Sequence, residues 1–497
     1  MDSSLDRSMS VPRQVSPASL RGVLVLSLLL LASACATVTP PRTAQTAQCR
    51  TFFTQIDSAV AKAGVSDGGA ARVPGYPYLR ADRVLASFAD DSLTAEGFGA
   101  WVERMRQLDL AARRSELRNL DAGSADAQWQ RAEQCGRTLR SLELTDDAAR
   151  SALRDHVRVR DDYSLAARGF GLYPLAVPFL NLGIKGYHRE VRADYARPLA
   201  QLDSPGPLLR WTPAPPTSEI AALPTVPLAR DALGVPLLSD AQWAALGARY
   251  APQWWIETGG DYDRPGAPVL GADGTPSVDP AEPVVYTLHE FTRFGDQVLP
   301  VLVYVIWFSE RPSQKAIDSY AGALDGLVWR VVLDPQLQPL VYDTIHPCGC
   351  YRYTFPVQAL TQILRGGFWQ EPVLFPQGEV PADAVALRIQ SETHYLRRVV
   401  APALATGDVH HYTLRPYADL LSLPAADGAR RSLFDTDGIV AGTQRGERWW
   451  LWITGVPDPG AMRQWGRHAT SFVGRSHFDD ARFLEQNFSV PDWAKTP

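Results

Sequence analysis

The sequence predicts an α+β fold, with a helical N-terminal domain followed by a mainly antiparallel β-sheet domain with a C-terminal helix. Three observations predict this class. Apolar residues recur at three- and four-residue spacing over residues 49–202, as in amphipathic helices. From about residue 240, β-rich runs follow one another through short connections, which favour antiparallel pairing. A proline-rich stretch, residues 203–238, separates the two patterns and is typical of a linker.

Length and composition set broad limits on function. The chain has 497 residues, of which 45% are hydrophobic and 21% are charged, as in ordinary globular proteins of two or three domains. The formal net charge is -5, and the chain has no long basic run. These features exclude a nucleic-acid partner, because nucleic-acid binding needs a concentrated basic surface.

The N-terminus has the pattern of a secretory signal peptide, which we assign to residues 1–34. Arg13 and Arg21 precede an apolar run at 22–34 that ends in small residues. This run is too short for a membrane-spanning helix, which needs about 20 residues. We therefore expect an exported protein.

The residues at the end of this run, Ala32-Ser33-Ala34-Cys35, resemble the lipobox of bacterial lipoproteins. The resemblance implies that Cys35 is acylated after removal of the leader, so that the partner of the mature N-terminus is the lipid bilayer. The absence of Asp after the cysteine implies an outer-membrane location facing the periplasm. The alternative is ordinary cleavage after Ala34, which would release the protein into the periplasm. Residues 35–48 are polar and contain two prolines, so we expect a lipidated tether.

The first folded domain, residues 49–202, is predicted to contain four to six helices and no strands. Thr94 is a candidate helix cap. Cys49 and Cys135 both lie in this domain, and once Cys35 is acylated they are each other's expected disulfide partners. A disulfide is consistent with an exported protein.

One segment of the helical domain, residues 169–184, has no charged residue. Pro174 and Pro178 are predicted to break any long helix here. The segment is interpreted as a buried connector beneath the helices. The alternative is an interfacial loop that dips into the membrane.

The second domain, residues 239–497, is predicted to be α+β. Residues 284–294 and 298–308 form a candidate hairpin, and residues 327–333 and 340–345 form another. Residues 384–399 and 448–454 have strand-like patterns, and 460–472 has a helical one. The pairs Trp254-Trp255 and Trp449-Trp450, with Trp452, could form a sugar-stacking platform; on alternating strands we instead expect one tryptophan of each pair to face the core.

The most concentrated chemical feature is His346-Pro347-Cys348-Gly349-Cys350. If the preceding strand continues, the side chains of His346, Cys348 and Cys350 share one face with that of Tyr342. Three readings stay open. The cysteines could form a structural disulfide or a buried pair in a tight turn. The three donors could bind copper or zinc, completed by His477 or His410. The cysteines could exchange disulfides, with His346 favouring the thiolate.

A second cluster lies near the C-terminus. On a helix over 460–472, Arg463 and Arg467 share one face and could bind an anionic group. The alternative is that this face is solvated or pairs with the domain's own acidic residues. His477 lies next to Asp479 and Asp480 and could be an oriented base or an ordinary surface pair.

The common enzyme motifs are absent from the sequence. There is no Gly-x-Ser-x-Gly elbow, no Walker A loop, no His-Glu-x-x-His motif and no dinucleotide-binding glycine motif. The leading interpretation is an envelope lipoprotein that works by interaction or assembly with other envelope proteins. The alternatives are a metal-binding or thiol-redox protein that uses the cysteine segment, and an envelope enzyme of unknown class.

Overall fold

The computed structural model of the chain describes residues 44–215, 221–363 and 366–495. The described residues from 45 onward belong to one compact unit. The predicted signal peptide, the lipidation site Cys35 and most of the predicted tether lie outside the described residues. The tether was expected to extend to residue 48, whereas helix α2 already begins at Ala44.

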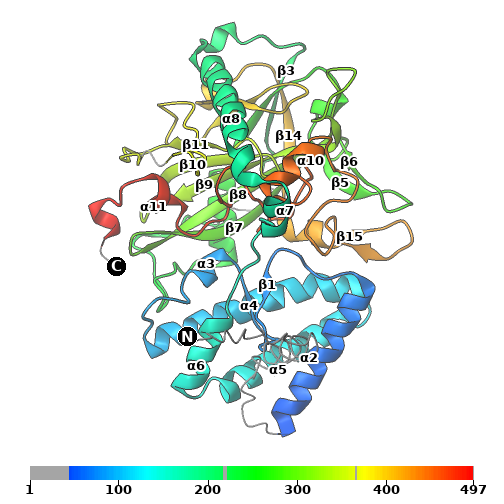
Figure 1. Ribbon diagram of the computed structural model, residues 1–497, viewed down its shortest axis with the longest axis vertical. Coiled ribbons are helices and arrows are strands. Elements are labelled where there is room, and N and C mark those ends of the chain that lie inside the picture. Colours follow the sequence, from blue (N-terminus) through cyan, green and yellow to red (C-terminus); the bar gives the residue numbers. More distant parts are fainter. Residues whose placement is uncertain (1–43, 216–220, 364–365, 496–497) are drawn as a thin grey trace, which may run out of the picture. The chain divides into compact units, whose positions relative to one another are not determined.

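The N-terminal region is helical, as predicted, with more helices than expected (Figure 1). Helix α4 begins after Thr94, whose hydroxyl accepts the backbone N–H of Gly97, so the predicted cap is present. A two-residue ribbon, β1 (Ala71–Arg72) with β2 (Arg80–Ala81), was not expected. The α-helices of this region are α2 (Ala44–Ala63), α3 (Arg83–Ala86), α4 (Ala95–Leu120), α5 (Ala125–Glu143), α6 (Asp147–His156), α7 (Leu165–Phe170) and α8 (Tyr173–Ala196).

The predicted disulfide between Cys49 and Cys135 is confirmed. It joins α2 to α5 across 86 residues of sequence, with the two Cα atoms 5.2 Å apart. Both cysteines belong to the apolar core of the helical region, together with Phe53, Trp101 and Met105. The disulfide therefore links the two helices through their buried sides.

A buried ion network crosses the same helical region. The Arg80 guanidinium donates to Glu116 at 2.8 Å and to Asp109 at 3.1 Å, and Arg113 donates to Asp109 at 2.6 Å. All four side chains are almost fully buried. Burial alone would raise the pKa of Glu116, but Arg80 and Arg72 lower it below its ordinary value. The carboxylate is therefore charged in the interior and depends on its guanidinium partners.

The second region is built on one ten-stranded mixed sheet, in the order β11-β10-β9-β8-β7-β14-β3-β4-β12-β13. The two predicted hairpins are present as β7–β8 and β9–β10, and most neighbouring pairs are antiparallel. The strands of this sheet are β3 (Leu208–Pro213), β4 (Gln253–Glu257), β7 (Val284–Phe294), β8 (Gln297–Arg311), β9 (Gly322–Leu333), β10 (Pro339–Ile345), β11 (Tyr353–Pro356), β12 (Ala386–Ile389), β13 (Leu396–Val400) and β14 (Asp408–Pro416).

The proline-rich stretch 203–238 is not a free linker. Its residues Leu208–Pro213 form β3, which pairs with β4 and β14 inside the sheet. β14 pairs with β3 through its first half and with β7 through its second half, so it joins the two halves of the sheet. Proline is absent from the interior of β3: Pro205 and Pro207 precede the strand, Pro213 is its last residue, and the other prolines of the stretch follow it.

Three local predictions in the second region are wrong in detail. Residues 384–399 form the two strands β12 and β13 rather than one. The aromatic run 448–454 is helical, as α10 (Arg448–Leu451) and a 3₁₀ turn at Trp452–Thr454. Residues 460–472 contain no helix, and the short C-terminal helix is α11 (Phe483–Asn487). The predicted fold class, with its C-terminal helix, is nevertheless confirmed.

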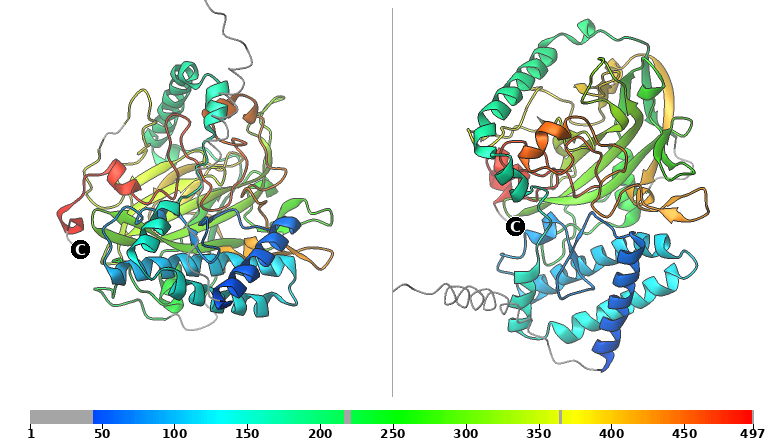
Figure 2. Two further views of the ribbon diagram at one scale, coloured as in Figure 1. Left: turned by 60° about the horizontal axis from the view of Figure 1, so that its bottom comes forward. Right: turned by 45° about the vertical axis from the view of Figure 1, so that its right-hand side comes forward.

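Both faces of the sheet are buried (Figure 2). One face packs against Val191 of α8 and against Trp243 and Leu246 of α9 (Asp240–Arg249). The other face packs against the mainly irregular C-terminal segment, including Met462 and Phe478. Helix α8 therefore lies over one face of the sheet near the β10–β11 end, where the functional candidates gather.

Replacing Glu116 by Gln tests the buried ion network. The substitution leaves Arg80 buried with a weakened partner, so we expect the free energy of unfolding to fall by about 3–5 kcal/mol. Glu133→Gln is the matched control, because Glu133 pairs with the exposed Arg137 and should contribute less than about 0.5 kcal/mol. Urea unfolding of both variants measures the difference. Equal losses in the two variants would contradict the assigned role of the network.

Candidate functional site

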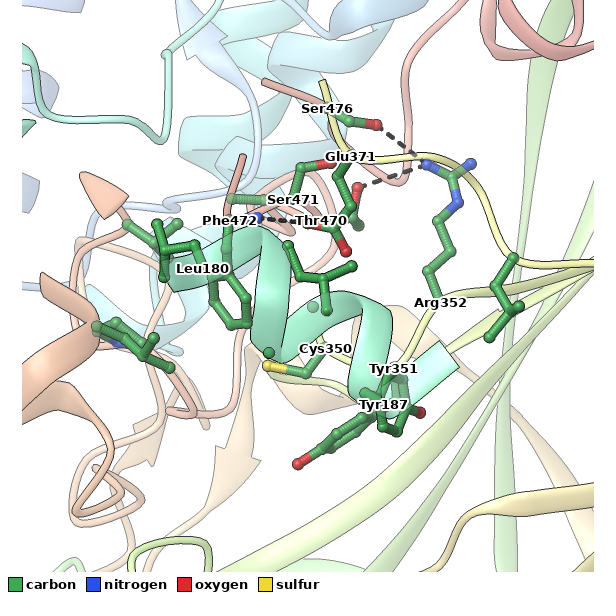
Figure 3. Close-up of a pocket in the computed structure, with 18 of the residues that line it drawn as sticks. Leu180, Tyr187, Cys350, Tyr351, Arg352, Glu371, Thr470, Ser471, Phe472 and Ser476 are labelled. Atoms are coloured by element: carbon green, nitrogen blue, oxygen red, sulfur yellow. Dashed lines mark hydrogen bonds between the residues drawn. The ribbon is translucent and has the colours of Figure 1, made fainter. Parts of the chain in front are cut away.

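A cavity of about 1030 Å³ lies between helix α8 and the end of the sheet (Figure 3). Ala176, Leu180 and Ile184 of α8 form its apolar wall. The opposite walls come from the turn between β10 and β11, from the loop around Glu371 and from the C-terminal residues 469–476. Several segments that are distant in sequence, residues 447–460 around α10 among them, thus enclose one space.

Helix α8 runs unbroken through the segment in which proline was predicted to break it. Pro174 lies in the first helical turn, where its missing N–H leaves no hydrogen bond unmade, and Pro178 lies inside the helix. Val177, Ile184, His188 and Val191 are buried on the inner side. The outer side of α8 is exposed. The expectation that residues 169–184 form a buried connector is therefore wrong for this outer side.

Two carboxyl groups that line the cavity have raised pKa values, so each is partly protonated near pH 7. Burial raises the pKa of Glu371 to about 7 and that of Glu447 to about 7. The Glu371 carboxyl accepts the backbone N–H of Phe472 at 2.8 Å, as Figure 3 shows. A protonated carboxyl can donate a hydrogen bond, so the cavity offers neutral donors near pH 7 beside apolar walls.

The His-Pro-Cys-Gly-Cys segment is a tight turn and not a continued strand. β10 ends at Ile345, and the N–H of His346 then donates to the carbonyl of Cys350 at 3.0 Å. Gly349 has φ +90°, a backbone conformation that favours glycine. The side chains of His346, Cys348 and Cys350 therefore do not share one face, and the strand-based reading of this motif is wrong.

The two cysteines of this turn are unpaired thiols that line the cavity. The backbone N–H of Cys350 donates to Cys348 Sγ at 3.4 Å. A hydrogen bond with Cys348, together with burial, raises the pKa of Cys350 well above its ordinary value. The environment therefore disfavours the thiolate that disulfide exchange would need. Among the described residues, no three His, Cys, Asp or Glu side chains are arranged to hold a metal ion.

His346 belongs instead to a buried chain of alternating histidines and aspartates. Asp325 accepts from His346 Nδ1 at 3.1 Å and from His394 Nδ1 at 2.8 Å. His394 Nε2 lies 3.3 Å from Asp263. Burial alone would raise the pKa of Asp325, but the two histidines hold it well below its ordinary value. Sequence reasoning missed Asp263, Asp325 and His394. The one local signal of this buried chain was Asp325 itself, an aspartate within the apolar strand β9.

The two histidines of this chain differ in their protonation. Burial lowers the pKa of His346, and Asp325 offsets this only in part. Burial alone would also lower the pKa of His394, but its hydrogen bonds to Asp263 and Asp325 raise it above its ordinary value. His394 is therefore the one of the two that retains its proton to higher pH.

Two tyrosines connect this buried chain to the cavity. Tyr351 and Tyr395 line the cavity, and their rings lie 5.0 and 5.7 Å from that of His346. Tyr351 and His394 both have left-handed backbone conformations, with φ of 60° and 54°. Such conformations are costly for side chains of this size and gather at functional sites. The wall of the cavity at Tyr351 is therefore held in place by the buried chain behind it.

The other histidines considered as ligands lie away from the cysteines. His477 packs edge-on against Tyr163, with ring centres 5.3 Å apart, and its backbone N–H donates to the Asp480 carboxylate. His410 stacks on Trp211. The structure brings neither of them to the cysteine turn.

Arg463 and Arg467 do not form a helical face. The Arg463 guanidinium is buried and donates to the carbonyls of Pro457 and Asp458. Arg467 is paired with Asp162 at 2.6 Å. Their charges are engaged by the protein itself, in agreement with the alternative of internal pairing and not with an open anion site.

The predictions for the two groups of tryptophans have different outcomes. Trp254 and Trp255 are both buried in the sheet, where one of the pair was expected to be. Trp449, Trp450 and Trp452 are exposed by 72%, 47% and 41%, so the expectation that one of the second pair faces the core is wrong. They lie on α10 and the following turn, next to α7 and α8.

No protein-family model, curated protein or solved structure matches this chain. Within the described residues, none of the helices combines the length and the apolar character needed to cross a bilayer.

Replacing Glu371 by Gln tests the protonated carboxyl. Its pKa rises on folding from about 4.5 to about 7, so its contribution to stability is full below pH 4.5 and is lost as the pH rises through 7. The amide cannot ionise, so the variant should gain about 3 kcal/mol relative to the parent between pH 4.5 and pH 8. Urea unfolding across this range measures the gain. Glu379→Gln, an exposed position of the same loop, is the control; parallel curves for all three proteins would contradict the prediction.

Proposed function

We propose that this protein is a membrane-anchored, periplasm-facing protein that binds an amphipathic small molecule in the cavity beneath α8. The observation that supports binding is the cavity itself. Its volume of about 1030 Å³ is at the upper end of the range for small-molecule sites. Its lining combines apolar side chains with a few convergent polar groups, which is the usual composition of such sites.

The lining favours a ligand with a neutral polar end and a long apolar part. Leu180, Ile184 and Phe472 offer apolar contacts. The arginine side chains that line the cavity are already engaged, Arg352 by Asp343 and Arg475 by Asp161. The remaining hydrogen-bonding capacity includes the carboxyls of Glu371 and Glu447, whose raised pKa values of about 7 leave a substantial neutral fraction near pH 7. An acylglycerol has the matching chemistry.

A charge placed on the cavity wall tests this binding. Leu180→Asp puts a carboxylate among apolar contacts, so the affinity for a fluorescent NBD-labelled monoacylglycerol should fall at least about tenfold. Leu182→Asp is the matched control, because Leu182 lies on the same helix and is 68% exposed. Residues 45–497, a compact unit of their own, suffice for the titration.

The companion variant Ala176→Trp narrows the same wall without adding charge and should also weaken binding. Circular dichroism and urea unfolding verify that each variant is folded. Equal affinities for the Leu180 and Leu182 variants, or no binding by the parent protein, would refute the proposed ligand class.

Membrane anchoring through acylated Cys35 is the second part of the proposal. It is supported by the apolar run at 22–34 and by the small residues before the cysteine. The Cys49–Cys135 disulfide supports an oxidising compartment. Several acyl chains would give the durable attachment that one chain lacks. The proposed location is the periplasmic side of the outer membrane.

Replacing Cys35 by Ala tests the anchor. We expect loss of metabolic palmitate labelling and retarded processing of the leader, because the acylated cysteine would be the substrate of the processing step. Cys350→Ala, which removes a thiol outside the N-terminal region, is the control and should leave labelling unchanged. Equal palmitate incorporation into the parent protein and the Cys35 variant would contradict the proposed anchor.

A further inference from the structure

An apolar surface extends over the outer side of α7 and α8 and the adjoining aromatic residues, and we name it the α7–α8 surface. Phe170 is 85% exposed, Phe179 is 77% exposed and Trp449 is 72% exposed. The large exposed apolar residues of this surface are Leu165, Phe170, Leu172, Leu175, Phe179, Leu182, Phe368, Trp369, Trp449, Trp450 and Trp452.

Contacts between the contributing segments make this surface continuous. Arg168 of α7 donates to the carbonyl of Thr454, two residues after the exposed Trp452. Gly171 packs closely against Ile453. On the other side, Asn181 of α8 donates to the carbonyl of Phe368 at 2.9 Å. Three segments distant in sequence are thus held side by side with their apolar side chains outward.

Such a surface is unusual for a protein that is surrounded by water. Single exposed apolar residues are common, but a contiguous group of this kind marks an interaction site. The run 169–184 within it has no charged residue. Nothing in the described part of the chain covers these side chains, so a partner outside it is needed to remove them from water.

We propose that the α7–α8 surface docks into the headgroup and upper acyl region of an anionic lipid bilayer. Tryptophan and phenylalanine beside leucine are the residues that favour this layer. Directly after the apolar run, α8 continues with the exposed basic residues Lys185, Arg189 and Arg192, accompanied by one exposed acidic residue, Glu190. Basic side chains bordering an apolar helix face complement anionic headgroups.

The same charges argue against a second copy of the chain as the occupant. A symmetric dimer through this surface would present the same charges from both copies, so Lys185, Arg189 and Arg192 would gain no acidic surface to pair with. The described helices cannot cross a bilayer, so α8 would lie in the plane of its surface. If Cys35 is acylated, the tether up to Ala44 spans at most about 30 Å, which keeps the folded unit close to the bilayer.

Docking also places the mouth of the cavity at the lipid surface. Phe179 and Trp450 line the cavity and are also exposed on the α7–α8 surface. A ligand with an acyl chain could then pass between bilayer and cavity without crossing water. This consequence rests on the proposed ligand-binding function, whereas docking itself does not.

Flotation with vesicles tests the docking. Residues 45–497 are mixed with vesicles of phosphatidylethanolamine and phosphatidylglycerol, or of phosphatidylcholine alone. We expect the parent protein to float with the anionic vesicles. Leu175→Ser, Leu182→Ser and Trp449→Ser combined should lower the partition coefficient at least about tenfold, because three anchoring side chains are lost. Ile317→Ser with Leu404→Ser, which changes exposed apolar residues elsewhere, is the control.

The basic residues are tested separately. Lys185→Ala with Arg189→Ala should weaken flotation with anionic vesicles about tenfold and leave that with phosphatidylcholine unchanged. All substituted side chains are exposed, so unfolding midpoints should stay within the range of the parent protein. Equal losses with both kinds of vesicle would overturn the role of charge.

Failure of docking can be distinguished from failure of ligand binding. The triple variant should still bind the fluorescent monoacylglycerol, and Leu180→Asp should still float. A parent protein that floats with neither kind of vesicle would overturn the docking proposal, whatever its ligand affinity. Analytical ultracentrifugation that shows a dimer abolished by the triple variant would also overturn it, in favour of a second copy as the occupant.

Discussion

The rest of the structure depends on a sheet whose two faces must both be buried. Twelve consecutive residues of β8, from Gln297 to Phe308, are buried, and since neighbouring side chains point to opposite faces, neither face can remain in water. On one face the cover comes from α8 and α9, and on the other from the C-terminal segment. The C-terminal segment follows a long irregular path because it has to cover the second face of the sheet.

The cover over the first face is incomplete near the β10–β11 end, and the cavity is the result. The C-terminal half of α8 packs against the sheet through Val191. Its N-terminal half instead contacts Val473 and Phe472 of the C-terminal segment, so it is held away from the strands. The space left beneath is walled by the cysteine turn, and Tyr351 in that wall is supported by the buried chain of His346, Asp325 and His394.

The parts of the fold that sequence could predict are local. Alternating runs and tight turns predict the hairpins β7–β8 and β9–β10. The Thr94 cap lies next to the helix that it begins. β3 was missed because its partners β4 and β14 are distant in sequence, while the prolines around it resemble a linker. The run 448–454 was misassigned because aromatic residues in succession fit both a strand and an exposed helix.

The candidate site was harder to predict, for the same reason. The partners of Asp325 are 21 and 69 residues away, so no spacing rule could group them. Cys348 and Cys350, which the sequence singles out, line the cavity, but their assumed strand geometry was not found, because the backbone turns at Gly349. Periodicity also identifies the two sides of α8 without saying which side is covered, and exposure of the outer side became visible only with the packing around it.

Helix α8 can serve a cavity and an outer surface at once because the two roles use different sides of it. Leu180 and Leu182 are two positions apart, so their side chains point about 200° apart around the helix. Leu180 lines the cavity while Leu182 is 68% exposed. Phe179, between the two sides, reaches both. The apolar character of 169–184, which first suggested a buried connector, is therefore explained by contacts on both sides, with the cavity inside and the proposed lipid surface outside.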